Sequence, residues 1–141
     1  MNTQIVRDWM TPNPTIITPK TPLPEAQELM MDNNIRRLPV VKREKLVGIV
    51  TLGDIREAMP SDVTSLTIHE MTYLLDRLYA REFMTGDPVT VSPNATIAEA
   101  ARLMLDYKVG GLPVMEDGEL DGIITETDFC RLLIAEPEPA F

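Results

Sequence analysis

The sequence predicts an α+β fold, α/β-like in its alternation of strands and helices. Two βαββα repeats are expected to pack with pseudo-two-fold symmetry into one module, joined by a linking helix. Three observations predict this fold. The chain of 141 residues aligns with itself without a gap. Runs rich in β-branched residues alternate with segments whose apolar residues recur at helical spacing. Hydrophobic residues make up 44% of the chain and aromatic residues only 5%, so the predicted core is aliphatic.

The internal repeat is the strongest of these observations. The second copy follows the first at an offset of 74 residues, as from Met10 to Met84. A regular self-match of this length is typical of a duplicated structural unit. The matching segments are Met-Thr-x-x-Pro (10–14 and 84–88), Glu-Ala (25–26 and 99–100), Leu-Pro-Val (38–40 and 112–114) and Gly-Ile (48–49 and 122–123).

Each copy is predicted to begin with a short β-rich strand that ends near a proline, followed by a helix. Apolar residues recur at helical spacing over 23–30 and 97–104. Thr96 and Glu99 have the spacing of a capping box at the start of the second of these helices. The predicted strands span 15–17 and 89–91.

Two further strands and a second helix complete each copy. A charged turn separates the two strands, and the helix is predicted to start near Asp54 and Asp128. The order in each copy is therefore β-α-β-β-α. The predicted strands span 38–41 and 46–50 in the first copy and 112–115 and 120–124 in the second.

A linking segment joins the copies. The tripeptide Pro60-Ser61-Asp62 breaks the chain, and Thr67 and Glu70 have capping-box spacing before an apolar helical stripe. The stripe either packs on the module, which we prefer, or binds a partner. Its residues are Ile68, Met71, Leu74, Leu75 and Leu78. The predicted domains are repeat 1 (1–60), the linking segment (61–79), repeat 2 (80–135) and a frayed tail (136–141).

Composition argues against several classes of protein. A net charge of −9 opposes general nucleic-acid binding, which requires Lys and Arg to neutralise phosphates. The single cysteine, Cys130, cannot form an intramolecular disulfide, so we expect a reducing compartment, the cytoplasm. The N-terminus does not resemble a signal peptide, and no apolar stretch approaches the roughly 18 residues of a membrane span. We therefore expect neither nucleic acid nor membrane as a partner.

The sequence does not predict an enzyme. Its one histidine, His69, lies in the linking helix, and one histidine cannot build a His-rich metal site. The sequence contains no nucleophile elbow, Walker loop or Gly-x-Gly-x-x-Gly motif. We expect no catalytic residue, no metal site and no required cofactor.

The motif with the clearest chemistry is Gly-x-x-Thr-x-x-Asp, at 48–54 and again at 122–128. Threonine ends a strand, and aspartate falls in the first turn of the next helix. A carboxylate there can accept both hydroxyls of a ribose, and the helix N-terminus favours anions. The alternative is that the aspartate only caps the helix.

Two packed copies would form clefts along their seam, and symmetry would make two of them. A single copy has a sheet only two or three strands wide, with helices on one side. Two copies can bury the open sheet faces against each other. Small ligands usually bind in concave seams of this kind.

These motifs together resemble the cystathionine-β-synthase (CBS) domain family. The resemblance covers about residues 6–57 and 80–133 and rests on Met-Thr-x-x-Pro, Leu-Pro-Val and Gly-x-x-Thr-x-x-Asp in both copies. The linking helix also looks like that of stand-alone bacterial CBS-pair proteins of the acetoin utilisation type. The resemblance implies a paired CBS, or Bateman, module whose ligands are adenosine derivatives: AMP, ADP, ATP or S-adenosylmethionine.

The resemblance also implies which residues contact the ligand. The motif aspartate holds the ribose, and apolar residues of the Leu-Pro-Val strand and of the first strand of the other repeat hold the adenine. Basic residues just before Leu-Pro-Val reach phosphates. Carried over by position, the first cleft comprises Asp128, Thr125, Thr127 and Lys108 with Asn13, Thr15, Ile35 and Arg36.

The second cleft is predicted to be less basic. It comprises Asp54 and Thr51 with Asp87 and Val89, and it has Asn34 and Gly110 at the matching basic positions. Because phosphates require nearby positive charge, we expect the Asp128 cleft to bind a nucleotide better. The Asp54 cleft would be weak, empty or suited to a neutral or cationic ligand.

Two functions remain open at this point. The preferred one is a regulatory module in which the adenosine ligand shifts the conformation and signals to an unidentified protein partner. The alternative is a ligand-free dimerisation or interaction module. A homodimer is expected in either case. Apolar positions predicted to be exposed and suitable for dimer contact are Ile55, Met59, Phe129, Leu132 and Leu133.

Overall fold

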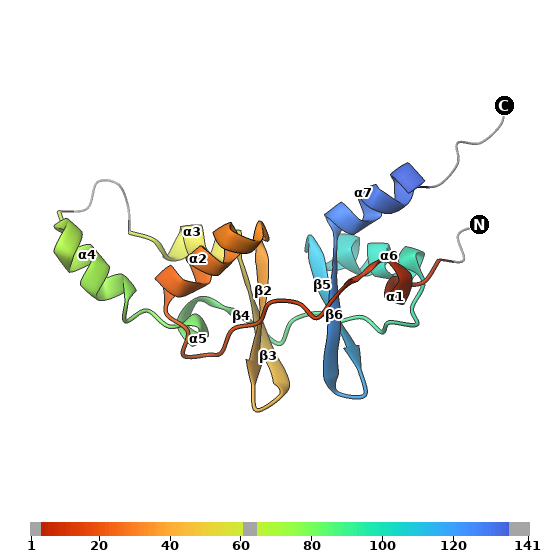
Figure 1. Ribbon diagram of the computed structural model, residues 1–141, viewed down its shortest axis with the longest axis horizontal. Coiled ribbons are helices and arrows are strands. Elements are labelled where there is room, and N and C mark those ends of the chain that lie inside the picture. The colour runs from red at the N-terminus through yellow and green to blue at the C-terminus, as the bar shows by residue number, and fades with distance from the viewer. Residues whose placement is uncertain (1–3, 61–64, 136–141) are drawn as a thin grey trace. The chain divides into compact units, whose positions relative to one another are not determined.

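The computed structural model describes residues 4–60 and 65–135 (Figure 1). The predicted break at Ser61-Asp62 and the predicted frayed tail, 136–141, lie outside the described residues. The described chain forms two compact units, each with its own sheet. Unit 1 comprises 4–14 and 89–135, and unit 2 comprises 15–60 and 65–88. None of the described helices is both long enough and apolar enough to cross a membrane.

Unit 2 is built around a three-stranded antiparallel sheet with the order β2-β3-β4. Strands β2 and β3 form a hairpin, and β4 adds to β3 from the start of the second sequence copy. The elements are α2 (Leu23–Asn33), β2 (Arg37–Lys42), β3 (Lys45–Thr51), α3 (Leu52–Ala58), α4 (Ile68–Leu75), α5 (Ala80–Phe83) and β4 (Thr85–Gly86).

Unit 1 repeats this arrangement with the order β1-β6-β5. Strands β5 and β6 form the hairpin, and β1 comes from the start of the first sequence copy. The elements are α1 (Val6–Trp9), β1 (Thr11–Pro12), α6 (Ile97–Tyr107), β5 (Gly111–Glu116), β6 (Glu119–Thr125) and α7 (Glu126–Ala135).

The two copies therefore exchange their first segments. The Met-Thr segment of each copy pairs with the last strand of the other copy, so the compact units do not coincide with the repeats read from the sequence. A glycine allows this close approach. A Cβ placed on Gly122 would lie 2.7 Å from the Thr11 carbonyl oxygen and 2.7 Å from Sδ of Met10. Gly48 meets Thr85 and Met84 in the same way.

The predicted first strands of the copies are reduced to single bridges. Ile17 pairs in parallel with Val40, and Val91 with Val114. Ile17 uses both its backbone groups, donating to Pro39 O at 3.0 Å and accepting from the N–H of Val41 at 2.8 Å. Prolines on both sides prevent longer pairing, because proline has no N–H to donate.

Each unit has an aliphatic core, as the composition predicts. The helical stripes predicted for α2 and α6 face these cores. The buried residues of unit 2 are Ile17, Leu23, Ala26, Met30, Leu38, Val40, Val50, Ile55 and Ala80. Those of unit 1 are Val6, Val91, Ile97, Ala100, Met104, Leu112, Val114, Ile124 and Leu132.

The linking helix α4 forms where the capping spacing predicts it. Oγ1 of Thr67 accepts the backbone N–H of Glu70 at 3.1 Å. No residue of α4 is buried, however, and Ile68 is 82% exposed. Only Leu75, together with Leu78 just beyond the helix, packs on the core of unit 2. The stripe therefore packs on the unit at one end only.

Candidate functional site

The first Gly-x-x-Thr-x-x-Asp motif joins β3 to α3 through a capping box. Oδ2 of Asp54 accepts the backbone N–H of Thr51 at 2.9 Å. In return, Oγ1 of Thr51 accepts the backbone N–H of Asp54 at 3.1 Å. The capping role considered from the sequence is therefore present. It uses one carboxylate oxygen, and within the described residues Oδ1 of Asp54 has no hydrogen bond or ion pair.

The second motif joins β6 to α7 and has the first of these two hydrogen bonds, but its aspartate also has a further partner. Oδ2 of Asp128 accepts the backbone N–H of Thr125 at 2.8 Å. The hydroxyl of Thr125 lies 3.5 Å from the same oxygen. Oδ1 accepts from Nη1 of Arg131 at 3.0 Å. Asp128 is only 2% exposed, so its carboxylate is a buried acceptor with a cation bound to it.

Lys108 lies next to the second motif. It is the C-cap of α6 in the left-handed conformation, with φ 55°. Three residues later Gly111 pairs with Thr125, and the N–H of Glu126 donates to Gly110 O at 3.1 Å. Left-handed backbone is unfavourable for lysine and well tolerated by asparagine, which occupies the matched position, Asn34, with φ 52°.

Arg36, Ile35 and Thr15 belong to unit 2, the unit of Asp54. The backbone oxygen of Arg36 accepts the N–H of Leu52 at 2.8 Å, directly beside the first motif. Ile35 is half-buried and Arg36 is exposed. None of these three residues belongs to the unit of Asp128. Their assignment to the Asp128 cleft therefore stays a prediction.

The remaining predicted residues are divided between the units as the exchanged segments require. Asn13 shares unit 1 with Asp128, and Asp87 shares unit 2 with Asp54. Both have left-handed backbone, with φ 49° and 45°. Because Pro12 pairs with Gly122, the chain at Asn13 runs away from the strand end at Thr125. Thr127 is exposed in the first turn of α7, and Val89 belongs to unit 1.

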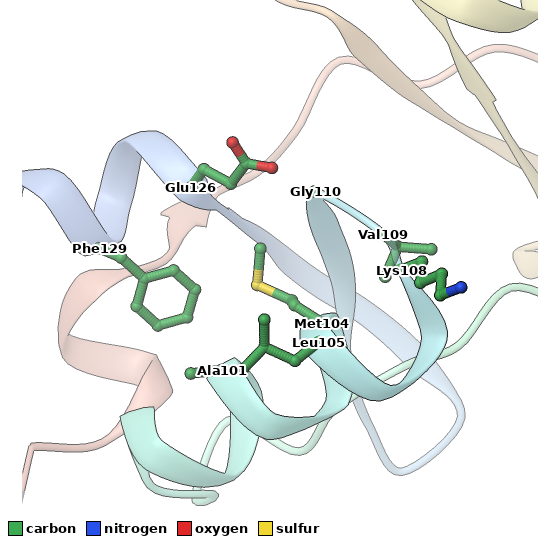
Figure 2. Close-up of a pocket in the computed structure, with 8 residues that line it drawn as sticks. All are labelled: Ala101, Met104, Leu105, Lys108, Val109, Gly110, Glu126 and Phe129. Carbon is green, nitrogen blue, oxygen red and sulfur yellow. The ribbon is translucent and has the colours of Figure 1, made fainter.

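A pocket of about 520 Å³ lies between α6 and α7 of unit 1. Figure 2 shows Phe129 of α7 facing Ala101, Met104 and Leu105 of α6, with the amino group of Lys108 pointing away from the ring. Neither Thr125 nor Asp128 lines it. This apolar groove therefore meets the motif only at Glu126, and Lys108 and Gly110 also border it.

The predicted dimer surface needs a correction. Ile55 and Leu132 are core residues, 0% and 3% exposed, because they occupy the buried faces of α3 and α7. Phe129 and Met59 are half-buried, and Leu133 is 70% exposed. The large exposed hydrophobic residues of α6 and α7 are Leu105, Tyr107, Leu133 and Ile134.

Two residues next to the motifs were not predicted as site residues from the sequence. Arg131 follows Asp128 by three residues, and Glu57 follows Asp54 by the same distance. Helical spacing of i and i+3 was the pattern that could have identified the Asp128–Arg131 pair. Among the described residues, no group of three or more His, Cys, Asp or Glu side chains could hold a metal ion.

Sequence relatives resemble the chain over most of its length. An inosine-5′-monophosphate dehydrogenase from Korarchaeum cryptofilum is 37% identical over 88% of this chain. A CBS domain-containing protein from Dictyostelium discoideum is 34% identical, and the match covers 96% of this chain and 94% of that protein. The chain spans only 22% of the dehydrogenase and 46% of the matching Methanocaldococcus jannaschii protein, MJ1225.

Solved structures confirm the predicted α+β fold with two repeats. A Vibrio cholerae protein named for acetoin utilization (AcuB) has a TM-score of 0.78 and 32% identity, with 95% of this chain and 94% of that chain covered. CBSX2, solved in complex with AMP, has a TM-score of 0.74, 30% identity and coverage of 93% and 96%. The CBS domain pair of MJ0100, in complex with 5′-methylthioadenosine and S-adenosyl-L-methionine, has a TM-score of 0.76, 27% identity and coverage of 96% and 99%.

The model of one family matches the chain twice. That family is described as the CBS domain, and the matched residues are 6–61 and 80–135. The matches include both Gly-x-x-Thr-x-x-Asp motifs and both Met-Thr segments. The chain therefore belongs to the CBS domain family and carries two copies of the domain.

Proposed function

We propose that this chain is a regulatory module that binds an adenosine derivative at its two Gly-x-x-Thr-x-x-Asp motifs. The observation that carries the proposal is the repeated position of the aspartate. Asp54 and Asp128 each lie in the first helical turn after a strand, where Oδ2 is fixed by a threonine N–H. The capping bond orients the carboxylate, and Oδ1 remains the atom that a ribose hydroxyl would approach.

The ligand class follows from chemistry and from the relatives. A ribose carries two adjacent hydroxyl donors, and an aspartate has two acceptor oxygens. Solved relatives carry AMP, 5′-methylthioadenosine and S-adenosylmethionine, all adenosine derivatives. We extend this class, with ADP and ATP, to the present chain as a regulatory ligand.

The Asp128 site is proposed to prefer a phosphorylated ligand. Arg131 pairs with Asp128, and Lys108 belongs to the same unit at the end of α6, whereas Asn34 and Glu57 occupy the matched positions in unit 2. Arg36, which lies beside the first motif in unit 2, is proposed to serve the Asp128 ligand as the family pattern implies. Charge-assisted bonds to phosphate are roughly twice as strong as neutral ones.

Regulation requires that the ligand bind two conformations with different affinity. We propose a homodimer that passes this change to a protein partner. Since the chain has a single, exposed cysteine, we propose the cytoplasm as its compartment.

The first experiment is a thermal-shift screen with AMP, ADP, ATP and S-adenosylmethionine, followed by calorimetry on Asp128→Ala and Asp54→Ala. A ligand at 100 times its Kd stabilises the native state by about 2.7 kcal/mol. Asp128→Ala is expected to remove the tight nucleotide binding and leave only weak binding at Asp54, whereas Asp54→Ala retains the tight binding. The reverse result would contradict the assignment of the nucleotide to Asp128, and no shift with any ligand would contradict the function.

A ligand-free interaction module is the second candidate. The observation that favours it is the apolar groove between α6 and α7, next to Leu105 at 79% and Leu133 at 70% exposure. Sedimentation of Leu105→Glu tests it. A dimer that dissociates in this variant, without any thermal shift by adenosine ligands in the wild-type chain, would favour this candidate.

A further inference from the structure

The ion pair between Asp128 and Arg131 is a feature that the first motif lacks. Nη1 of Arg131 lies 3.0 Å from Oδ1 of Asp128. The side chain of Asp128 is 3% exposed, whereas that of Arg131 is 65% exposed. A buried acceptor is thus held by a cation that reaches it from the solvent side of α7.

The pair limits how many hydroxyls Asp128 can accept. A carboxylate offers about four lone-pair positions. Those on Oδ2 face the N–H of Thr125 at 2.8 Å and, more weakly, its hydroxyl at 3.5 Å. Arg131 takes one of the positions on Oδ1. About one position therefore remains open, and a second ribose hydroxyl must displace either the weak contact of the Thr125 hydroxyl on Oδ2 or Arg131 on Oδ1.

The matched aspartate has no such competitor. Glu57, an exposed acid, stands three residues after Asp54, where the second copy has Arg131. Oδ2 of Asp54 accepts the N–H of Thr51, and in the part of the chain that the structure describes Oδ1 has no partner. Both lone pairs of this oxygen are open to a ribose.

We infer that Arg131 makes the Asp128 site select adenosine derivatives that carry a phosphate over those that do not. An uncharged nucleoside competes with Arg131 for Oδ1 of Asp128 and offers the displaced guanidinium no replacement. A nucleotide brings a phosphate, with which a released guanidinium forms charge-assisted bonds. This inference rests on the proposed function and names the ligand class of one of its two sites.

The test compares AMP with adenosine by calorimetry, with Asp54→Ala present so that only the Asp128 site is measured. Adding Arg131→Gln should tighten adenosine about two- to fivefold, the size expected for a partly exposed ion pair. It should not tighten AMP, because the phosphate loses its cation. The ratio of AMP affinity to adenosine affinity therefore falls, and an unchanged or larger ratio would overturn the inference.

Two matched variants separate the pair from general charge. Arg102→Gln removes an exposed cation of α6 in the same unit and should leave the ratio unchanged. Glu57→Arg, made with Asp128→Ala, gives Asp54 a cation at the same helical spacing and should raise the ratio at that site. A fall of the ratio with Arg102→Gln, or no rise with Glu57→Arg, would count against Arg131 as the cause.

The salt dependence of adenosine binding separates competition for Asp128 from a purely structural role of the ion pair. Salt screens a partly exposed ion pair, although less than a fully exposed one, so adenosine binding to the Asp128 site should tighten modestly as salt increases, and Arg131→Gln should remove this dependence. Adenosine itself is uncharged, so direct screening of the ligand is small. Binding that does not respond to salt in the wild-type chain would contradict the competition.

Failure of the inference differs from failure of the proposed function. In one outcome the Asp128→Ala chain binds AMP or adenosine, and the Asp54→Ala chain binds neither, with or without Arg131→Gln. The proposed function then holds for the Asp54 site alone, and the inference about Arg131 fails. If the wild-type chain binds none of the adenosine ligands, the proposed function fails, and the inference fails with it.

Discussion

The two Gly-x-x-Thr-x-x-Asp motifs have the same backbone hydrogen bond but different neighbours. In each, Oδ2 of the aspartate accepts a threonine N–H, at 2.9 Å for Asp54 and 2.8 Å for Asp128. Arg131 then pairs with Asp128, whereas Glu57 cannot pair with Asp54 because both are acids. The fold dictates the shared bond, and the exposed side chains beside it are free to differ.

Backbone hydrogen bonds are also shared by the two units outside the motifs. The N–H of Val6 donates to Ala95 O at 2.9 Å, and the N–H of Ala80 donates to Thr21 O at 2.9 Å. Each bond ties the helix at the start of one copy to the other copy's helix-forming half. The duplication thus repeats the framework in both units, and chemical differences are confined to side chains that the framework does not require.

The largest expected effect tests whether the framework is equivalent in the two units. Gly122→Ala and Gly48→Ala each place a Cβ within 2.9 Å of a backbone oxygen of the exchanged strand, that of Thr11 or Thr85. Since a backbone strand cannot move aside as a side chain can, we expect each change to lower the free energy of unfolding by about 1–3 kcal/mol in urea denaturation.

Gly86→Ala is the control for the loss of a glycine, because a Cβ there meets nothing within 4 Å. It should change the free energy of unfolding by less than about 0.5 kcal/mol. A large effect at Gly122 with a small one at Gly48 would break the equivalence of the two units.

The fold could be predicted because its determinants are local and repeated. Helical spacing at Leu23 and Ile97 identified α2 and α6, and the spacing of Thr96 and Glu99 identified a cap that the structure contains, with the N–H of Glu99 3.1 Å from Oγ1 of Thr96. The sequence also indicated both strands of each hairpin, because a charged turn separates two apolar runs.

The exchange of first segments and the partners of the site residues could not be predicted in this way. The pairing of Thr11 with Ile123 depends on contacts more than 100 residues apart, which no local pattern encodes. Ile55 and Leu132 were assigned to an exposed surface because helical spacing alone does not say which of two apolar faces meets the core. The Arg131 contact required side-chain geometry.

The second expected effect concerns Lys108. Replacing it with the matched residue, as Lys108→Asn, relieves a left-handed lysine, and we expect the free energy of unfolding to rise by about 0.5–1 kcal/mol. The same change should weaken AMP binding about tenfold if the lysine reaches a phosphate. Thermal denaturation and calorimetry on one protein sample measure both quantities.

Asn34→Lys is the reciprocal variant and should lower stability by a similar amount without lowering AMP affinity at the Asp128 site. Stability that falls with Lys108→Asn would show that the lysine makes a favourable contact that offsets its backbone conformation. Unchanged AMP binding would remove Lys108 from the candidate site.

The smallest expected effect concerns an ion pair that only unit 1 has. Arg7 donates to both carboxylate oxygens of Glu116, at 3.0 and 3.2 Å, and the matched residues of unit 2, Arg81 and Lys42, carry charges of the same sign. Lys42→Glu would let Arg81 form the missing pair and should raise the free energy of unfolding by about 0.2–1 kcal/mol. Because the pair is exposed, the gain should shrink at high salt. A gain that persists at high salt would mean that the new carboxylate does not stabilise the unit through an ion pair with Arg81.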